Sequence, residues 1–464
     1  MKLDPADVQG TILQGYRVDH ARHLVLCVVD AAGARAFLRS LVEPASGMPQ
    51  ITTAQRWTVK PQSFMNIGIT AAGLAALGQA LEGFPAAFRR GATDPATAQL
   101  VGDTGDSAPS RWVEGFADGA RAHLILSLWV HRDRDVLEQV SGVLRGAFGG
   151  SLQELAAQDA SALPDNQVHF GYRDNISQPT VQGAPPPKRP LPDRQPVSPT
   201  GEFLLGYPNQ NRGAVYKVTP AELSTNSSFA AFRLLEQDVA GFEAWLSSAA
   251  EEAGIDRELL AAKVCGRWRT GAPLVLSPGS GTPDPPLAPA RINDFDYVSD
   301  DPSLDDTFGY RCPIGAHIRR TNPRGAQVIA GGSLHRIVRR AMPFGPPYDP
   351  ARADDVPRGL VGWFINADIA NAFELIMSEW VNDSAFVRSV RGPDGANPVK
   401  NISGQDVLLG VNDPATSSFS LSIPPTATAP WSNRRLTGFG PFVTTRGGAY
   451  CYLPSITALR VISG

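Results

Sequence analysis

The sequence predicts an α+β protein built from two sandwiches, each with helices packed against an antiparallel sheet. Apolar runs of strand length alternate with segments of helical periodicity along much of the chain, and this alternation is typical of strand–helix units. The same order of elements recurs on both sides of a proline-rich stretch. Because 464 residues exceed what a single ordinary core holds, we expect two domains.

The N-terminal half contains three strand–helix units and one further strand. Strands are expected at residues 23–29, 64–70, 122–130 and 167–172. Helices follow the first three, and the third helix is expected to begin near Asp133. These elements fit either a parallel doubly wound sheet or a ferredoxin-like sandwich. We favour the sandwich because no glycine-rich phosphate-binding fingerprint accompanies the strands.

A proline-rich stretch at 184–196, A-P-P-P-K-R-P-L-P-D-R-Q-P, separates the two halves. It is unsuited to regular helix or interior strand, since proline lacks the backbone N–H. We therefore expect an N-terminal ferredoxin-like domain over 1–183, a connector over 184–200 and a C-terminal ferredoxin-like domain over 201–464. Binding to a proline-reading partner is the alternative role for the stretch.

The C-terminal half repeats this organisation. A strand is expected at 228–235, followed by a helix with Asp238 as its N-cap. A Gly/Pro/Asp-rich excursion at 270–306 then interrupts the pattern. The remaining elements are strands at 334–341 and 359–366, a helix at 370–381 and a closing strand pair around 442–453.

The composition narrows the classes of partner and the cellular location. A charged fraction of 19% and a net charge of −3 lack the single-sign excess of nucleic-acid or polybasic membrane binders. No apolar run has the length of a membrane span, and the first ten residues lack the apolar core of a signal peptide, so we expect a cytoplasmic protein. The four cysteines lie far apart without a C-x-x-C pair, which favours reduced thiols.

His317 is the most informative single residue. It lies in F-G-Y-R-C-P-I-G-A-H-I-R-R-T-N-P-R at 308–324, where Pro313 and Gly315 favour a short helical turn. The run after it contains Arg319, Arg320 and Arg324. Guanidinium groups suit anionic partners, so a histidine beside this run fits haem, with the imidazole on iron and arginine on a propionate. A surface histidine beside a solvated basic run is the alternative.

Two further residues complete a chemical set with His317. Asp174 lies in a tight G-Y-R-D-N turn ahead of the proline-rich stretch, and Arg339 lies near the end of an expected strand. Each alone has an ordinary structural explanation, as a turn-stabilising carboxylate or a surface arginine. Together with an iron ligand, they match what peroxide chemistry requires: a group that moves a proton between peroxide oxygens, and a cation that stabilises the departing hydroxide.

Six stretches resemble landmarks of the dye-decolourising peroxidases, which are haem proteins with two ferredoxin-like domains. They span almost the whole chain in the expected order. The stretches are D-V-Q-G-T-I-L-Q-G-Y at 7–16, G-Y-R-D-N-I-S-Q-P at 171–179, C-P-I-G-A-H-I-R-R-T-N-P-R at 312–324, R-I-V-R-R-A-M-P-F-G at 336–345, F-E-L-I-M-S-E-W at 373–380 and F-V-T-T-R-G-G-A-Y-C-Y-L-P-S-I at 442–456.

The resemblance implies haem b (iron protoporphyrin IX) held in the C-terminal domain. By it, His317 is the iron ligand, Asp174 the distal acid–base residue and Arg339 the distal arginine. Arg319 becomes a propionate partner and Leu360 a residue of the haem pocket. A ligating imidazole normally donates its other N–H to an acceptor, for which the sequence offers two candidates, Glu374 and Asp383.

The chain also departs from the family pattern. Asn175 replaces a glycine of the distal loop, and we expect the turn to survive because asparagine tolerates left-handed backbone angles. Gly362 stands where the family commonly has a phenylalanine over the haem, which predicts an enlarged distal pocket. Ala341 replaces a frequent glycine after the arginine pair.

Three functions follow from these residues. The first is a haem peroxidase that uses hydrogen peroxide to oxidise bulky phenolic or dye-like organic reductants by one-electron steps. The second is a haem-dependent oxygenase or peroxygenase that acts on a specific biosynthetic substrate in the wider pocket. The third is a non-catalytic haem-binding protein with Cys312 as the iron ligand.

Overall fold

The computed structural model describes residues 2–185, 197–283, 285–325, 335–352, 354–386, 390–391, 398–399, 403–423 and 432–464. Most of the connector expected at 184–200 lies outside these residues, so the domain boundaries stay a prediction. Within the described part of the chain, no helix is long and apolar enough to cross a membrane.

One antiparallel sheet of eight strands organises the molecule, in the order β4-β1-β3-β2-β12-β5-β7-β6. Each group of four has the strand arrangement of a ferredoxin-like sandwich, so the predicted α+β class is confirmed. The strands are β1 His20–Val28, β2 Ser63–Ile69, β3 Leu124–Val130, β4 Leu152–Ser161, β5 Ser228–Gln237, β6 Val338–Phe344, β7 Gly359–Asn366 and β12 Val443–Leu453.

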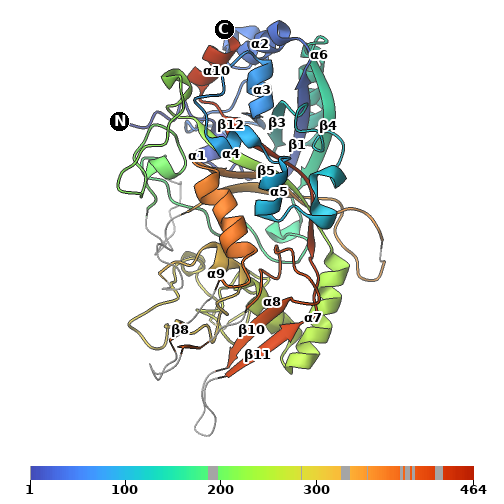
Figure 1. Ribbon diagram of the computed structural model, residues 1–464, viewed down its shortest axis with the longest axis vertical. Coiled ribbons are helices and arrows are strands. Elements are labelled where there is room, and N and C mark those ends of the chain that lie inside the picture. The colour runs from blue at the N-terminus through green and yellow to red at the C-terminus, as the bar shows by residue number, and fades with distance from the viewer. Residues whose placement is uncertain are drawn as a thin grey trace.

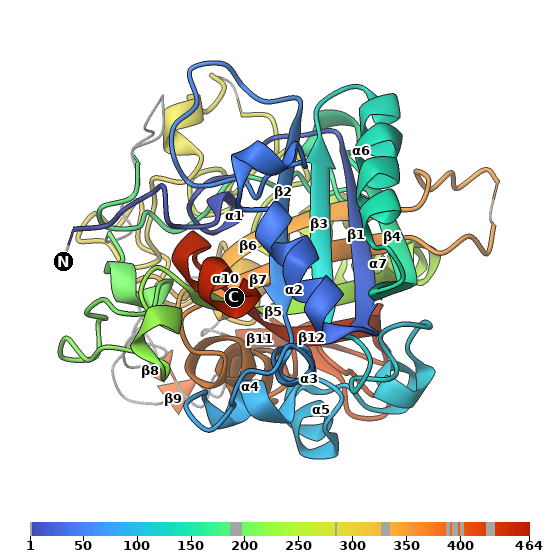
Figure 2. The same ribbon diagram turned by 90° about the horizontal axis from the view of Figure 1, so that it is seen from above.

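Helices cover both faces of this sheet. Those of the N-terminal half are α1 Gly10–Leu13, α2 Ala31–Ser40, α3 Ala71–Ala76, α4 Ala86–Arg90, α5 Pro95–Val101 and α6 Arg134–Ala147. In Figure 1, α2, α3 and α6 lie at the top with the C-terminal helix α10 (Ile456–Ser463), and Figure 2 shows α2 and α6 in front of β1 and β3. Asp133 caps α6 as expected, because its side chain accepts from the N–H of Asp135.

The lower layer in Figure 1 belongs to the C-terminal half. It contains α7 Val239–Ala253, α8 Arg257–Cys265, α9 His317–Thr321 and the hairpin of β10 Ser418–Ile423 and β11 Ser432–Thr437. Asp238 caps α7 by accepting from the N–H of Gly241, as predicted. The expected helix at 370–381 is present as two π-helical segments, Ala370–Glu374 and Ile376–Val381. A two-residue pair, β8 Val390–Arg391 and β9 Pro398–Val399, completes the described strands. The described residues also include short 3-10 helices at Pro44–Ser46, Gly105–Ser107, Pro109–Arg111, Pro164–Asn166, Thr200–Glu202, Ala221–Leu223 and Pro289–Arg291.

Three predicted strands differ from the structure. The fourth strand is β4, and residues 167–172 form a turn in which Gly171 has φ +81°. β4 escaped detection because it is an edge strand with a largely half-buried, polar sequence. β6 begins at Val338, later than expected, and includes Pro343, which an edge strand tolerates.

The expected closing strand pair is one continuous strand, β12, with an irregularity between Thr445 and Gly447. Gly447 does not make a turn there. A Cβ at this position would lie 2.8 Å from the ring of Phe116, so the glycine leaves room for that ring.

The two halves share the largest hydrophobic cluster, and two smaller clusters lie mainly in the C-terminal half. β2 and β12 pair at Ile69 and Tyr452, which joins the two groups of strands into one sheet. Trp363 of β7 is 1% exposed, and its indole N–H donates to the hydroxyl of Ser127 in β3 at 3.0 Å. The largest buried cluster accordingly contains residues from both halves. Separate cores for the two sandwiches, which the two-domain organisation implied, are not what the structure shows.

Candidate functional site

His317 is the first residue of α9, a helix of five residues that begins directly after Pro313 and Gly315. The expected short helical turn is therefore confirmed. The side chain of His317 is 22% exposed, and its Nδ1 lies 3.0 Å from Oδ2 of Asp406. Within the described residues, Nε2 has no hydrogen-bond partner.

Asp406 is the acceptor that sequence reasoning missed. Its side chain is fully buried, and Oδ1 accepts from the backbone N–H groups of Leu408 and Leu409 at 2.9 and 3.0 Å. Burial alone would raise the pKa of this carboxyl, but His317, the nearby Arg320 and the Leu409 N–H outweigh burial, so the pKa lies below its usual range. An ionised Asp406 fixes the orientation of the imidazole, with Nδ1 protonated.

The two acceptors proposed from sequence, Glu374 and Asp383, are wrong. Glu374 is buried and lies 3.5 Å from the guanidinium of Arg90, and burial raises the pKa of its carboxyl. Asp383 accepts from the N–H of Ala385 in its own turn. Asp406 lies 89 positions after His317, so no local spacing pointed to it.

The basic run after His317 is buried, which excludes the solvated-surface alternative. Arg319, Arg320 and Arg324 are 1%, 0% and 6% exposed. Arg319 donates to the carbonyls of Cys312, Asp306 and Thr307 at 2.7, 3.0 and 3.1 Å. Both terminal nitrogens therefore bond within the chain, whereas the buried Nε has no partner among the described residues, and the role of Arg319 as a propionate partner stays a prediction.

Asp174 lies on a loop whose turn has survived the loss of a family glycine. Asn175 has φ +59°, the left-handed conformation expected of it. The N–H of Asp174 donates to the carbonyl of Asn166 at 2.8 Å. Asp174 is half-buried, and its carboxylate forms no hydrogen bond within the described residues; its role in proton transfer stays a prediction.

The Asp174 loop lies along strand β6. His169 Nε2 lies 2.7 Å from the carbonyl of Phe344, at the end of this strand. Near the start of the strand, the N–H of Arg339 donates to Gln178 at 3.0 Å, and its guanidinium donates to the carbonyl of Ser177 at 3.3 Å. These contacts bracket Asp174 and bring its loop to the exposed side chain of Arg339.

Charges from both parts of the candidate site reach one buried thiol. Burial raises the pKa of Cys265, at the end of α8, to about 12. Arg267 lowers this pKa, and smaller opposing contributions come from Asp406 and Arg339. At neutral pH this buried thiol is therefore protonated.

Gly362 does not open a pocket. It pairs with Ala341 of β6, and a Cβ at Gly362 would lie 2.1 Å from the carbonyl oxygen of Arg340 and 2.5 Å from Cα of Ala341. The neighbouring backbone thus occupies the space that a side chain would need, and the prediction of an enlarged distal pocket at this position is wrong. Leu360 is half-buried on the same strand, between Leu235 and Pro343; its role at the haem stays a prediction.

Cys312 is unsuited to be the iron ligand. It is 0% exposed, and burial raises the pKa of its thiol to about 12, so the thiol stays protonated at neutral pH. All four cysteines are free, in keeping with the reduced thiols expected from the sequence, and all four are buried.

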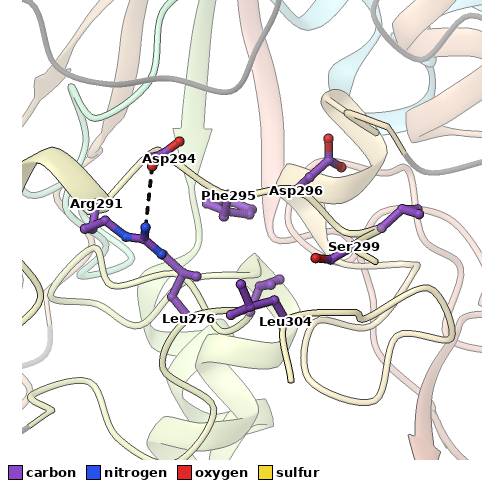
Figure 3. Close-up of a pocket in the computed structure, with 9 residues that line it drawn as sticks. Leu276, Arg291, Asp294, Phe295, Asp296, Ser299 and Leu304 are labelled. Carbon is purple, nitrogen blue, oxygen red and sulfur yellow. Dashed lines mark ion pairs between the residues drawn. The ribbon is translucent and has the colours of Figure 1, made fainter. Parts of the chain in front are cut away.

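A small pocket lies within the excursion at 270–306 (Figure 3). It is lined by Leu276, Phe295 and Leu304, with a long ion pair of 3.7 Å between Arg291 and Asp294 at its edge. None of the predicted site residues lines this pocket. It is therefore separate from the candidate site.

The residues around His317 fit haem iron. The imidazole has an ionised carboxylate on Nδ1 and a free Nε2, which is the donor arrangement of a ligating histidine. Arg339 donates to the carbonyl of Ser177 on the Asp174 loop, and the roles of Asp174 and Arg339 stay predictions.

Comparison with known proteins gives the same picture. A dye-decolorizing peroxidase of Mycena epipterygia is 32% identical over 99% of this chain and 87% of its own length. A multifunctional dye peroxidase of an Amycolatopsis species is 29% identical over 98% of this chain and 95% of its own length. No family model matches the chain.

Solved structures share the fold over its full length. A dye-decolorizing peroxidase in complex with 2,6-dimethoxyphenol superposes with a TM-score of 0.80 at 29% identity, and the match covers 100% of both chains. The imidazole complex of the Auricularia auricula-judae enzyme also gives 0.80, at 26% identity. The fold is that of solved dye-decolorizing peroxidases, and one such enzyme is 32% identical over 99% of this chain. The chain therefore belongs to the dye-decolourising peroxidases, which are haem enzymes that depend on hydrogen peroxide.

Proposed function

We propose that the protein binds haem b through His317 and uses hydrogen peroxide to oxidise bulky phenolic or dye-like compounds in one-electron steps. The observation that carries this proposal is the His317–Asp406 pair, with Nδ1 committed to a buried carboxylate and Nε2 free. The complex of one similar structure with 2,6-dimethoxyphenol supports a phenolic reductant.

Each residue of the set has a role that its position allows. Asp406 holds the imidazole of His317 in one orientation and one tautomer. Asp174 takes a proton from one peroxide oxygen and delivers it to the other, which departs as water. Arg339, anchored to the Asp174 loop, stabilises the negative charge that develops on the departing oxygen.

Bound haem would supply the redox chemistry, taking two oxidising equivalents from peroxide and returning them one at a time. Overall, one hydrogen peroxide and two phenols give two waters and two phenoxyl radicals, which then couple. The balance requires no further reductant.

The alternatives from the sequence have lost their supporting observations. The oxygenase hypothesis depended on a wide pocket at Gly362, but backbone atoms of Arg340 and Ala341 occupy the space beside this glycine. The hypothesis of a non-catalytic haem-binding protein depended on Cys312 as the iron ligand, but its thiol is buried and protonated.

Product analysis tests the proposal. Purified protein loaded with haem is mixed with hydrogen peroxide and 2,6-dimethoxyphenol, and the products are identified by mass spectrometry. We expect coupled dimers at two phenols consumed per peroxide. A single product carrying one oxygen atom from peroxide would support an oxygenase and contradict the proposal.

We also propose a cytoplasmic location, which the four free cysteines support because reduced thiols are typical of that compartment. Fractionation of the source cells, with detection by antibody, tests this. Recovery outside the cytoplasm would contradict it.

A further inference from the structure

Arg320 is a fully buried cation that forms no ion pair with a carboxylate within the described residues. Its guanidinium instead binds backbone carbonyls and stacks on the ring of Phe386, whose centroid lies 4.9 Å away. The carbonyls are those of Gly315 at 3.2 Å, Trp380 at 2.7 Å, Asp383 at 3.4 Å and Gly404. Burying a charge without a carboxylate partner costs free energy of folding, which suggests that Arg320 has a specific role.

These carbonyls belong to three segments that are far apart in the sequence. Gly315 precedes α9, which carries His317, and Trp380 lies at the end of the second π-helical segment. Gly404 lies two residues before Asp406. The N–H of Asp406 also donates to the carbonyl of Val381 at 2.8 Å, which ties the same two segments together next to Arg320.

One guanidinium therefore fixes the segment of His317 relative to the segment of Asp406. Arg320 lies three residues after His317 on the same short helix. If its planar fork moved, Gly404 and the adjacent Asp406 would move relative to the imidazole, and the 3.0 Å hydrogen bond between Nδ1 and Oδ2 would lengthen.

The charge of Arg320 supports the same role. Burial lowers its pKa to about 10, and Asp406 and Asp383 oppose this shift, so the group stays protonated at neutral pH. Its positive charge therefore persists where the carbonyl oxygens of Gly315, Trp380, Asp383 and Gly404 face it.

We propose that Arg320 is a positioning residue for the iron ligand: it holds Asp406 against His317 and so sets how strongly the imidazole donates to bound iron. The inference rests on the proposed function, since it assigns a purpose to the His317–Asp406 pair. Arg320 acts through the segment of Asp406, since its hydrogen bonds within the described residues go to backbone carbonyls and not to His317.

Arg320→Lys tests this because lysine keeps the charge but loses the planar fork. We expect haem to leave the variant about 10–100-fold faster, the usual effect of disturbing a residue behind a metal ligand. The Fe(III)/Fe(II) midpoint potential should rise, because a weaker bond to Asp406 makes the imidazole a poorer donor. Haem transfer to an excess of a scavenging globin measures the rate, and a redox titration followed by absorption measures the potential.

Arg267→Lys is a matched control. Arg267 is 6% exposed and donates to the carbonyls of Gly271 and Ile292 at 3.0 and 2.7 Å. It lies over the ring of Phe295, and burial lowers its pKa to about 10 as well. Both variants should lower the melting temperature of the haem-free protein, but only Arg320→Lys should change the haem release rate and the potential.

Two further variants keep the test decisive. In an Asp406→Asn background, Arg320→Lys should no longer shift the potential, since Arg320 acts through the carboxylate. If Arg320→Lys does not fold, Phe386→Leu removes only the stacked ring, and it should raise the potential by a smaller amount. Parent-like haem release and potential in every folded variant would overturn the inference and leave the peroxidase proposal intact. A parent protein that binds no haem would overturn both.

Discussion

At the scale of single residues, the candidate site depends on which groups are buried with partners and which are left available. Asp406 is buried, ionised and fully bonded, and His317 retains a free Nε2. The Asp174 carboxylate is half-buried without a hydrogen bond among the described residues. We expect this division to separate the residues that hold the geometry of the site from the residues that react.

Asp174→Ala and Arg339→Leu should each slow the reaction with hydrogen peroxide while haem stays bound. A positioned acid–base group typically contributes about 10²–10⁴-fold, and a fixed charge at a developing anion contributes a similar factor. Stopped-flow absorption at increasing peroxide concentrations measures the rate constant. If both variants react as fast as the parent, neither residue has the assigned role.

Gly362→Ala should destabilise the fold without enlarging or closing a substrate site. The added Cβ would meet the backbone of Arg340 and Ala341, which cannot move aside as a flexible side chain can. We expect a loss of about 1–3 kcal/mol in the free energy of unfolding, measured by urea denaturation. Gly142→Ala is the control, because its Cβ would meet nothing within 4 Å and helix α6 favours alanine. A stability equal to the parent's in Gly362→Ala would contradict the close approach of the two strands.

At the scale of elements, apolar strands and capped helices could be predicted from the sequence, and elements defined by long-range contacts could not. β1, β5 and β7 are continuous apolar runs, so local composition revealed them. β4 is polar because it lies at an edge. In β12, Gly447 leaves room for the ring of Phe116 and Gly448 for the ring of Trp112, and both rings belong to a distant segment of the chain.

The candidate site shows the same limit. His317 was predictable because proline, glycine and arginines surround it in the sequence. Asp406 was not, because only folding brings it to the imidazole. The prediction of an enlarged pocket at Gly362 was wrong because sequence comparison does not show the pairing of Gly362 with Ala341. This pairing brings the backbone of β6 into the space that a side chain at Gly362 would need.

Three strands are joined by a buried polar chain that makes stability depend on pH. The Trp363 indole of β7 donates to Ser127 of β3, whose oxygen lies 2.7 Å from Nδ1 of His23 in β1. Burial lowers the pKa of His23 from 6.5 to about 3. The folded protein therefore keeps this imidazole neutral over a range in which the unfolded chain protonates it.

The free energy of unfolding should accordingly fall as the pH falls from about 6.5 towards about 3. In that window the unfolded chain binds the proton and the folded chain does not, which gives a slope of up to about 1.4 kcal/mol per pH unit from this group. Urea denaturation at several pH values measures the slope. The substitution His23→Leu should make this dependence of stability on pH less steep. An unchanged slope would assign the pH dependence to other groups, such as His123 and His169, whose pKa values burial also lowers.

At the scale of the whole molecule, the two halves are one structural unit. The side chain of Gln9 is fully buried at the seam between them. It donates to the carbonyls of Ile67, in β2, and Pro454, just after β12, and it accepts from the N–H of Ile67, each at 2.9 Å. The N-terminal segment thus fastens the strands at which the two groups of four meet.

We therefore expect a single cooperative unfolding transition, and a large loss of stability in Gln9→Ala. The substitution leaves three buried backbone groups unpaired, at about 1–3 kcal/mol for each such group. Differential scanning calorimetry compares the calorimetric and van't Hoff enthalpies. Gln14→Ala is the control, because that side chain is only partly buried and bonds within the N-terminal half. Two resolved transitions in the parent would show that the halves fold independently.

The central claim is that His317 holds the iron of a bound haem, and the absorption spectrum of haem-loaded His317→Ala tests it most directly, with Cys312→Ala and the parent beside it. We predict that His317→Ala stays folded but loses most of its haem and the bands of imidazole ligation, because α9 is short and the shared core lies elsewhere. Cys312→Ala should match the parent, since its thiol is protonated and buried. A parent-like haem content and spectrum in His317→Ala would contradict the account.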